Sequence, residues 1–388
     1  MTEKLYYKDS YMSNFTASVL KCRAYDGGFA VFLDRTAFFP EGGGQSADTG
    51  SIGTAHVFDV QEKDGIITHY TDTALEEGKK YSCRLDLEKR FRKMQNHTGE
   101  HIVSGLVHSL YGYDNVGFHL GSVDVTMDYN GVLTREDILK IEYLANKACS
   151  ENIDIITCFP EKEELENMKY RSKLELSENV RIVEIPGYDV CACCAPHVEK
   201  TGAVGIVKLL DFIKYKGGMR IHMKCGFDAL EDYNEKYRNI SEVAQRLSVK
   251  QSEVSEAVKR LENELSDKKR EYSELMKKYI LSKLEAEPLR DGNLIVFEEG
   301  LDADTQRAAA NFGKGRCSGI FGIFSGDDRD GYRYILASEN VKLRDYVKEN
   351  IKLSGGGGGS DEMMQGMYKC TRAEIEKAFS KDGFSDKT

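Results

Sequence analysis

The sequence predicts an α+β protein built from several folding units in series. Short β-type runs separated by turn signals fill the first 88 residues. Helical and strand patterns then mix up to about residue 232, and a long stretch of helix formers follows. With 388 residues, 40% of them hydrophobic, the chain is long enough for more than one buried core. We therefore expect a small N-terminal β-barrel, an α+β domain, a long helical arm and a C-terminal α/β domain.

The first unit, residues 1–88, has the pattern of a small all-β domain. Runs such as Ala30-Val31-Phe32-Leu33 and Ile66-Ile67-Thr68-His69-Tyr70 are bounded by turn signals. These signals are Asp26-Gly27-Gly28, Glu41-Gly42-Gly43-Gly44 and Asp64-Gly65. Short strands with frequent turns predict a β-barrel, and a sandwich is the alternative.

The second unit, residues 89–232, opens with a predicted helix that carries two histidines. Apolar residues recur at helical spacing between Lys89 and Leu106, and His97 and His101 stand four positions apart. Both imidazoles should therefore project from one face of the helix. A second helix is expected at residues 134–152, followed by strands near 153–159, 180–185 and 205–210.

Far downstream the run Cys193-Cys194-Ala195-Pro196-His197 supplies a second pair of metal-ligand side chains. Cys193 and His197 have the same separation as His97 and His101. Three imidazoles and one thiolate form a ligand set that zinc takes in tetrahedral sites. The sequence therefore predicts a zinc site inside the α+β domain.

Other interpretations of these residues remain open. A single histidine on an amphipathic helix is more often packed or solvated than a ligand, and only the second pair favours metal. The segment from His97 to His101 also fits the H-x-x-E-H pattern of inverted zinc peptidases, with Glu100 as general base, but this leaves the downstream pair unexplained. Cys191 and Cys194 are alternative thiol ligands, although the spacing to His197 favours Cys193.

Residues 233–287 form a long run of helix formers without glycine or proline. Apolar residues return every seven positions in two rows, which predicts a coiled-coil seam. A hairpin within the chain and a dimer stalk both fit, and the single long run favours an arm or stalk. One row holds Leu247, Val254, Leu261 and Leu275, the other Val258, Leu265, Tyr272 and Tyr279, with Lys268 and Gln251 as interruptions.

The last unit, residues 288–388, alternates predicted strands and helices. Strands are expected at 293–297, 318–324 and 332–338, and helices at 302–312, 342–350 and from 371. Its oddest element is the run of five glycines from Gly355 to Gly359. Such a run permits close approach of a partner to the backbone, as in a phosphate cradle, and it also suits a flexible linker. Composition does not separate the two.

Composition also limits the partners and the compartment. A net charge of −10 argues against a protein that coats nucleic acid indiscriminately, so any nucleic-acid contact must be local. We expect a cytoplasmic protein without a membrane span, because neither a signal peptide nor a run of about eighteen apolar residues occurs. The ten cysteines are then reduced thiols and a metal ligand. Basic clusters flank the predicted metal site: Lys200, Lys208, Lys214, Lys216, Arg220 and Lys224 on one side, and Arg84, Lys89, Arg90, Arg92 and Lys93 on the other.

Five segments in a fixed order carry a family resemblance. They are Thr36 to Gln45, with its Pro-Glu-Gly-Gly-Gly core, Asn96 to His101, Cys193 to Val198, Met219 to Ile221, and the glycine run with Ser360 and Asp361. They resemble the PEGGGQ, HTxxH, CGGTHV and G-x-RI segments of an editing domain and the GGGG segment of a DHH-associated domain. The chain thus resembles the long alanyl-tRNA editing proteins of the AlaX type, which are similar to the editing part of alanyl-tRNA synthetase.

The resemblance implies a zinc-dependent hydrolase that removes serine or glycine from mischarged tRNA(Ala). The synthetase itself is not implied, because no aminoacylation domain precedes this region. The family assigns Thr36 to reading the serine hydroxyl, and a site that hydrogen-bonds a hydroxyl rejects an analogue without one. The sequence departs from the family pattern where Cys194-Ala195-Pro196 stands in place of Gly-Gly-Thr.

The residues expected to do chemistry are Gln45, Thr36, His97 and His101. Gln45 is a candidate for positioning substrate, because the glycines before it allow close approach and an amide both donates and accepts; the alternative is a turn-capping glutamine. Zinc either activates water or only orients the RNA end.

Candidate RNA contacts are Arg220, Lys216, Lys214, Gly356, Gly357 and Gly358, and the helical arm or the last unit allows a homodimer. The alternative functions are a non-catalytic tRNA-binding module and the zinc peptidase; a DHH phosphoesterase is disfavoured because no Asp-His-His occurs.

Overall fold

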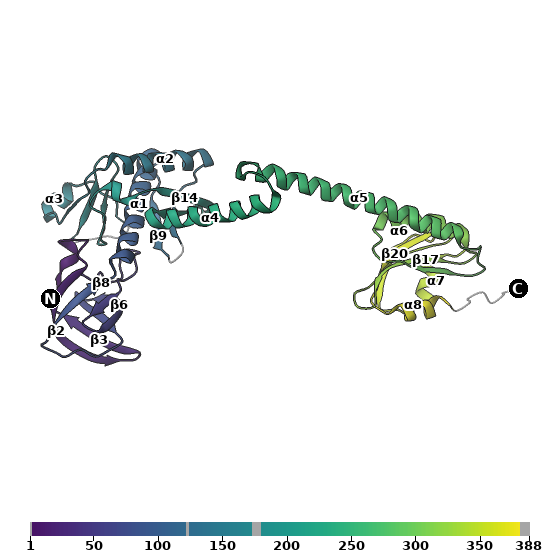
Figure 1. Ribbon diagram of the computed structural model, residues 1–388, viewed down its shortest axis with the longest axis horizontal. Helices are drawn as coiled ribbons and strands as arrows, with labels where there is room; N and C mark the ends of the chain where they lie inside the picture. The colour runs from purple at the N-terminus through teal and green to yellow at the C-terminus, as the bar shows by residue number, and fades with distance from the viewer. Residues whose placement is uncertain (1, 122–123, 173–179, 381–388) are drawn as a thin grey trace. The chain divides into compact units, whose positions relative to one another are not determined.

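The protein is a mixed α+β chain, shown as a computed structural model that describes residues 2–121, 124–172 and 180–380 (Figure 1). It divides into two compact units, Met1–Ile240 and Ser241–Thr388. The described residues form eight α-helices, and none of these helices is long and apolar enough to span a membrane. The α+β class and the N-terminal barrel are thereby confirmed, whereas the division into 1–88, 89–232, 233–287 and 288–388 stays a prediction.

A closed barrel of six antiparallel strands forms the N-terminal part, in the order β2-β3-β7-β6-β5-β8. Inward-facing residues such as Val19, Val31 and Ile67 are fully buried, as the alternation along each strand requires. Phe38, from the segment after β4 (Arg35–Thr36), packs into the same core. The barrel strands are β2 (Asn14–Tyr25), β3 (Gly28–Leu33), β5 (Gly50–Ile52), β6 (Ala55–Lys63), β7 (Ile66–Thr71) and β8 (Lys80–Leu85).

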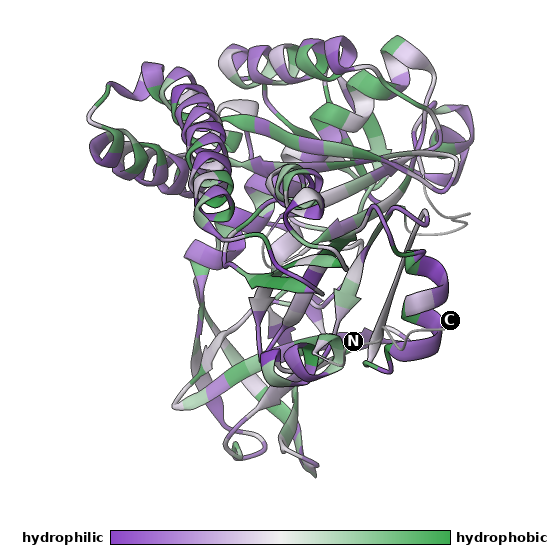
Figure 2. Ribbon diagram, turned by 90° about the vertical axis from the view of Figure 1, so that its right-hand side faces the viewer, coloured by the Kyte–Doolittle hydropathy of each residue, from purple (hydrophilic) through white to green (hydrophobic). Residues whose placement is uncertain are grey.

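The histidine helix, α1 (Leu87–Tyr111), follows the barrel directly. Its start is set by Asp86, whose side chain accepts from the backbone of Lys89, and its end by Gly112 at φ 69°, a left-handed conformation that glycine adopts easily. The second predicted helix is also present as α2 (Arg135–Glu151), which begins with a capping box at Thr134. Helical ribbons of the chain alternate between hydrophobic and hydrophilic residues along their length, as helices with one buried face do (Figure 2).

Two sheets complete the α+β part of the first unit. A four-stranded antiparallel sheet has the order β14-β15-β10-β9, and a three-stranded one has the order β11-β12-β13. Buried residues of α1, α2 and the larger sheet share one core that includes Met94, Ile141 and Ile221. The strands are β9 (Asn115–Leu120), β10 (Val125–Tyr129), β11 (Ile156–Cys158), β12 (Ile182–Ile185), β13 (Asp189–Ala192), β14 (Val207–Tyr215) and β15 (Gly218–Cys225), and a short helix α3 (Lys162–Asn167) follows β11.

The long run of helix formers makes two helices, α4 (Gly226–Leu247) and α5 (Val254–Ala286), where the sequence predicts one. The break falls at Ser248, which adopts a left-handed φ of 55°. The sequence gives no signal there because this position is usually glycine. Most residues of the predicted seam on α5 are exposed: Val258, Leu261, Leu265, Tyr272, Leu275 and Tyr279.

The second unit contains a five-stranded sheet in the order β16-β17-β18-β20-β19. The glycine run forms its edge strand β19, paired antiparallel with β20 along its whole length. The interpretation as a flexible linker is therefore wrong, and strand β20 was not predicted. The elements are β16 (Leu294–Phe297), α6 (Ala303–Gly313), β17 (Phe321–Asp327), β18 (Gly331–Ala337), α7 (Leu343–Asn350), β19 (Gly355–Gly359), β20 (Met363–Tyr368) and α8 (Arg372–Phe379). Residues 381–388 lie outside the described part of the chain.

Candidate metal centre

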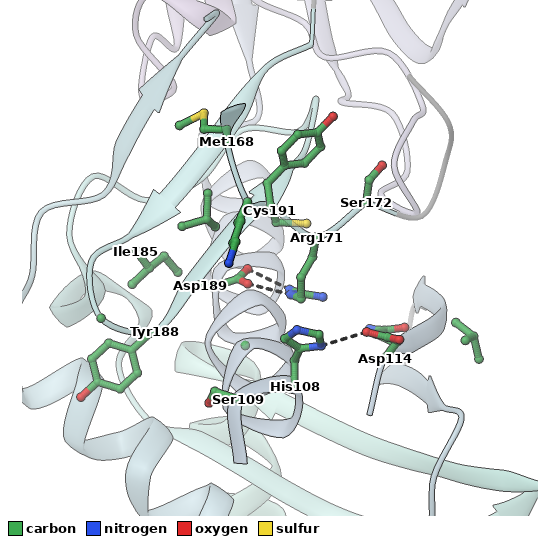
Figure 3. A pocket seen from close by; sticks show the side chains of 17 residues that line it. His108, Ser109, Asp114, Met168, Arg171, Ser172, Ile185, Tyr188, Asp189 and Cys191 are labelled. Carbon is green, nitrogen blue, oxygen red and sulfur yellow. Dashed lines mark hydrogen bonds and ion pairs between the residues drawn. The ribbon is translucent and has the colours of Figure 1, made fainter. Parts of the chain in front are cut away.

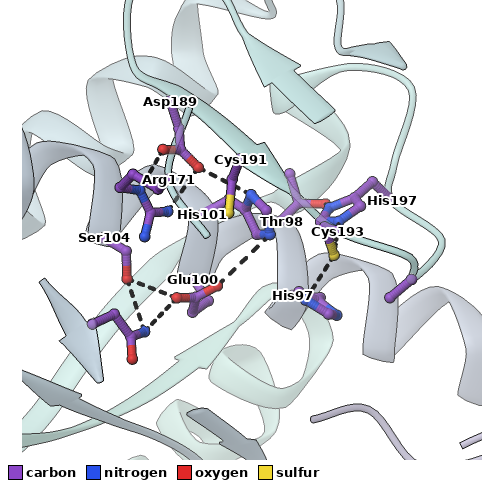
Figure 4. A network of polar contacts seen from close by, with 12 residues as sticks. His97, Thr98, Glu100, His101, Ser104, Arg171, Asp189, Cys191, Cys193 and His197 are labelled. Carbon is purple, nitrogen blue, oxygen red and sulfur yellow. Dashed lines mark hydrogen bonds and ion pairs between the residues drawn. The ribbon is translucent and has the colours of Figure 1, made fainter. Parts of the chain in front are cut away.

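Four side chains from two distant segments converge beside the barrel (Figure 4). His97 and His101 come from successive turns of α1, while Cys193 and His197 come from the loop after β13. One potential ligand atom of each lies within 4.8 Å of the others. The three imidazoles are at most 3% exposed, so water competes little for their nitrogens. The structure thus brings together the four residues that spacing singled out.

The separations in this cluster suit one small cation. The Sγ atom of Cys193 lies 3.5 Å from Nε2 of His97 and 3.3 Å from Nε2 of His197. Ligands placed about 2.0 to 2.3 Å from a tetrahedral zinc ion are roughly 3.5 Å from one another. The donor set and its spacing therefore fit zinc.

The other ring nitrogen of each histidine meets a polar side chain. Such contacts fix the orientation and tautomer of a metal-binding imidazole and leave Nε2 for the metal. The Nδ1 contacts, each 3.0 Å long, join His97 to Gln45 Oε1, His101 to Asp189 Oδ2, and His197 to Thr98 Oγ1. Neither Thr98 nor Asp189 was singled out from the sequence. Only the strand alternation of β13, which turns Asp189 and Cys191 inward, could have signalled the aspartate.

Asp189 is itself held by Arg171, whose Nε and Nη2 donate to its two oxygens at 2.7 and 2.8 Å. Burial alone would raise the pKa of Asp189, but hydrogen bonds from His101 and Arg171 lower it below its ordinary value. The carboxylate is thus ionised at neutral pH and polarises the His101 ring. Cys191 completes a second group of three possible ligand atoms with His101 and Asp189. Arg171 already neutralises that carboxylate, which makes the group less suited to a cation.

The electrostatics of the cluster favour a metal over protons. Burial, then the neighbouring His101 and His97, lowers the pKa of His197 well below its ordinary value, so its ring is neutral. Burial raises the pKa of the Cys193 thiol, which therefore needs a nearby positive charge to become a thiolate. A divalent cation supplies that charge.

The glycine turn before Gln45 places this side chain against His97. Gly42 and Gln45 exchange two backbone hydrogen bonds of 3.0 Å. Gly43 and Gly44 between them have φ values of 60° and 82°, and a Cβ on Gly44 would lie 2.5 Å from the Phe118 ring. Only glycine fits there. Gln45 is fully buried, and its Nε2 has no hydrogen-bond partner among the described residues.

The hydrogen bonds of Thr36 involve none of the four cluster residues. It ends β4 (Arg35–Thr36), which pairs in parallel with β1 (Glu3–Lys4). Its buried hydroxyl contacts Nε2 of His69 at 2.8 Å and accepts from the backbone N–H of Phe38 at 3.1 Å. His69 was not singled out from the sequence, because a lone histidine in a strand pattern carries no signal.

A hollow of about 950 Å³ opens on the outer side of Asp189 (Figure 3). Its walls come from the end of α1, the start of β9 and the β12–β13 hairpin. The Arg171–Asp189 pair and the exposed His108–Asp114 pair both line it. The hollow therefore reaches a carboxylate that contacts a cluster histidine.

The predicted RNA contacts fall in two places. Lys214 and Lys216 are exposed near the turn of the β14–β15 hairpin, and Arg220 lies on β15. The guanidinium of Arg220 donates to both oxygens of Asp128 at 2.6 and 2.7 Å and lies 3.9 Å from the centre of the Tyr215 ring. Gly356, Gly357 and Gly358 belong to the edge strand of the second unit.

Residues 180–262, which include Cys193 and His197, match the family described as "Threonyl and Alanyl tRNA synthetase second additional domain". The alanyl-tRNA editing protein AlaX-L of Pyrococcus horikoshii is 32% identical over 97% of this chain and 96% of its own length. The chain belongs to this alanyl-tRNA editing protein family, as the motifs predicted.

Alanine–tRNA ligases are also similar. The ligase of Ignicoccus hospitalis is 33% identical over 75% of this chain, and that of Methanococcus vannielii is 29% identical over 97%. The chain spans 33% and 43% of these two ligases, so it corresponds to only part of each.

Proposed function

We propose that the protein is a trans-editing hydrolase that deacylates tRNA(Ala) mischarged with serine or glycine, and that it requires a zinc ion held by His97, His101, Cys193 and His197. The convergence of these four ligand atoms, from three buried histidines and the half-buried Cys193, carries the proposal. The name of the Pyrococcus relative supports the substrate class.

When bound, zinc supplies Lewis acidity that polarises an ester carbonyl or lowers the pKa of water toward about 7; with four protein ligands it serves equally well as a scaffold for the RNA end. The surrounding side chains keep the three imidazoles in one orientation and one tautomer. Asp189 and Arg171 do this for His101, and Thr98 for His197. Preorganised ligands need no rearrangement when substrate arrives.

Gln45 is the substrate-facing donor in this proposal. Its Oε1 accepts from Nδ1 of His97, which fixes the amide and leaves the Nε2 hydrogens without a partner among the described residues. An unsatisfied buried N–H group gains most when an oxygen bearing negative charge comes within reach. Gln45 would therefore hold the ester oxygen on which charge develops during hydrolysis.

RNA contacts are proposed at the β14–β15 hairpin and at the glycine strand. Lys214 and Lys216 are exposed and would reach phosphates, although the Lys216 ammonium lies 5.1 Å from the centre of the Tyr215 ring. Arg220 is already paired with Asp128 and would mainly fix the hairpin. In β19, packing explains only alternate glycines. A Cβ on Gly357 would meet the Tyr334 hydroxyl at 2.2 Å, but nothing lies within 4 Å of one on Gly356 or Gly358. The two open glycines leave room for an RNA backbone to approach closely.

Self-association through α5 is proposed as well. Its exposed apolar residues repeat at heptad spacing, so a second copy would bury them in a coiled coil. Sedimentation of the whole protein tests this, and Leu265→Glu should shift a dimer to the monomer. An unchanged dimer in that variant would contradict pairing along this seam.

The peptidase alternative has less support. Glu100 is 2% exposed and accepts hydrogen bonds from Ser104 and Asn115, so its carboxylate is engaged within the core. The convergence of Cys193 and His197 with the helix histidines is also unexplained by a peptidase motif.

One assay tests the proposed function against its alternatives. Deacylation is measured on Ser-, Gly- and Ala-tRNA(Ala), with and without a zinc chelator, for the wild type and for His97→Ala. The proposal expects turnover of the serine or glycine ester that the chelator and the substitution both abolish. Binding of tRNA without turnover would support a non-catalytic module, and full activity in His97→Ala would exclude the zinc-dependent route.

A further inference from the structure

A histidine in the barrel interior has no part in the metal cluster. His69 lies on β7 between β3 and β6, in register with Val31 and Val60, and is fully buried. An imidazole in an apolar barrel core is destabilising unless its nitrogens are hydrogen-bonded, and an apolar residue would fill the space without that requirement. Its two partners therefore indicate what this histidine does.

The contacts of His69 determine its tautomer. Nδ1 lies 3.2 Å from the carbonyl oxygen of Val31. A carbonyl only accepts, so Nδ1 carries the hydrogen. Burial lowers the pKa of His69 to about 4, so the ring is neutral at pH 7. Nε2 then carries no hydrogen and can only accept.

Thr36 completes the arrangement. Its Oγ1 is 2.8 Å from Nε2 of His69, so the single hydroxyl hydrogen points at the histidine. The backbone N–H of Phe38 donates to the same oxygen at 3.1 Å. A hydroxyl oxygen has two acceptor positions and one hydrogen. Thr36 is therefore left with one acceptor position and nothing to donate.

The segment that begins at Thr36 is fixed to the helix of the metal cluster. Arg90 of α1 donates from Nη2 to the carbonyl of Ala37 at 2.7 Å and from Nε to Asp48 at 2.9 Å. Asp48 in turn accepts from the backbone of Phe39 at 2.6 Å. The same segment ends at Gln45, which contacts His97. Both ends of the segment are thus held relative to α1.

We propose that His69 is a positioning residue for substrate choice, because it holds the Thr36 proton and so presents Thr36 to a substrate as a hydrogen-bond acceptor only. The proposal rests on the proposed editing function, with Thr36 as the residue that reads the serine hydroxyl, the role that the family resemblance implies. A serine side chain offers a hydroxyl donor to that acceptor, whereas glycine and alanine side chains offer none. Without His69 the Thr36 hydroxyl can turn and donate, and the preference for a donor weakens.

The test compares His69→Phe with His69→Gln. Phenylalanine keeps a ring beside Phe38 but removes the acceptor for Thr36. Glutamine can accept from Thr36 through its amide oxygen and donate to Val31 through its amide nitrogen. We expect kcat/KM on Ser-tRNA(Ala) to fall about tenfold in His69→Phe relative to the glycine and alanine esters, which serve as internal controls, and to be largely restored in His69→Gln.

A control variant separates positioning from barrel stability. Ile67→Val lies on the same strand at a fully buried position and should lower the folding stability of the barrel without changing the contacts of Thr36. Its preference among the three esters should equal that of the wild type. If His69→Phe lowers all three rates equally, as a loosened barrel would, the positioning role is overturned.

A double-mutant cycle with Thr36→Val gives a second, independent readout. The account expects His69→Phe to change the ester preference no further once the Thr36 hydroxyl is absent. Additive changes in preference would contradict it. If the wild-type protein deacylates none of the esters, the proposed function itself is overturned. That outcome differs from additivity in the double-mutant cycle, which overturns only the role of His69.

Discussion

The first unit contains two groups of buried histidines that differ in how their nitrogens are used. In the cluster, His97, His101 and His197 each give Nδ1 to a neighbouring side chain and turn the other nitrogen toward Cys193 or toward one another. In the barrel, His69 satisfies both nitrogens within the core, through Val31 and Thr36. The imidazole rings of both groups are buried.

This difference shows that convergence of ligand atoms distinguishes a metal centre from an internal hydrogen-bond relay. The cluster brings together more ligand atoms with lone pairs than there are hydrogens nearby to bind them. Binding of a cation therefore stabilises the cluster. The barrel pair has no such surplus and can act only through the direction of one hydroxyl. The first three predictions each alter one side of this comparison, and the fourth concerns the glycine strand of the second unit.

The largest expected effect comes from Cys193→Ala, which removes the one thiol from the proposed zinc ligands. Deacylation should fall by on the order of 1000-fold, beyond the 10- to 100-fold typical of losing an outer partner of a metal ligand. Single-turnover assays on Ser-tRNA(Ala) measure this. Cys194→Ala is the matched control, because its exposed thiol is the next residue and is not part of the cluster; equal losses in both variants would speak against Cys193 as a specific ligand.

The second prediction concerns the pH dependence of stability that His69 contributes. Its folded-state pKa of about 4 lies below the ordinary value of 6.5, so the unfolded chain binds the proton first as the pH falls. The part of the folding stability that comes from the neutral His69 ring is fully present above pH 6.5. It decreases by roughly 3 kcal/mol in all as the pH falls toward 4.

Denaturant unfolding at pH 7 and pH 4 checks this. The stability advantage of the wild type over His69→Gln should shrink by that amount across the range, because glutamine does not titrate. The difference between the wild type and Ile67→Val should stay constant. A constant difference for His69→Gln as well would mean that His69 is not the neutral, buried group described.

The third prediction is that Asp189→Asn weakens zinc binding about 10- to 100-fold, because His101 loses the charged partner that orients it. Chelator competition measures the affinity. Asp128→Asn is a suitable control, since Asp128 also binds an arginine in a two-bond pair but lies outside the cluster. Weaker zinc binding in both variants to the same degree would point to general destabilisation.

The smallest effect on stability is expected in the glycine strand β19, at Gly356, and Gly357 serves there for comparison. Gly357→Ala should destabilise the second unit by about 1 to 3 kcal/mol, because its methyl group would overlap the Tyr334 hydroxyl. Gly356→Ala should leave stability within about 0.5 kcal/mol and still weaken tRNA binding. Thermal unfolding and tRNA anisotropy distinguish the two; unchanged tRNA affinity in Gly356→Ala would argue against RNA contact there.

Features that depend on local sequence could be predicted, whereas features that depend on tertiary contacts could not. Helix periodicity predicted both α1 and α2, and the range predicted for the second helix, 134–152, ends at its two cap residues, Thr134 and Asn152. The four cluster residues were found because equal spacing in two segments implied one site. The break at Ser248 was missed because no glycine or proline marks it, and strand β20 was missed because Gln365 and Gly366 interrupt its apolar run.

Contacts between distant segments could not be predicted from the sequence, for a different reason. Thr98 and Asp189 orient cluster histidines from positions set by tertiary packing, and no spacing links them to their partners. The Thr36–His69 contact joins β4, which pairs with β1 outside the barrel order, to β7 of the barrel, and no sequence spacing links the two residues. The five glycines resembled a linker because composition does not show that β20 pairs with them.

The most direct test of the account is X-ray absorption at the zinc edge of the purified full-length protein. The account predicts one zinc per chain with three nitrogen neighbours and one sulfur neighbour, and loss of the sulfur signal in Cys193→Ala. A zinc-loaded protein without sulfur in the first coordination shell, or a wild type that edits at full rate without any metal, would contradict it.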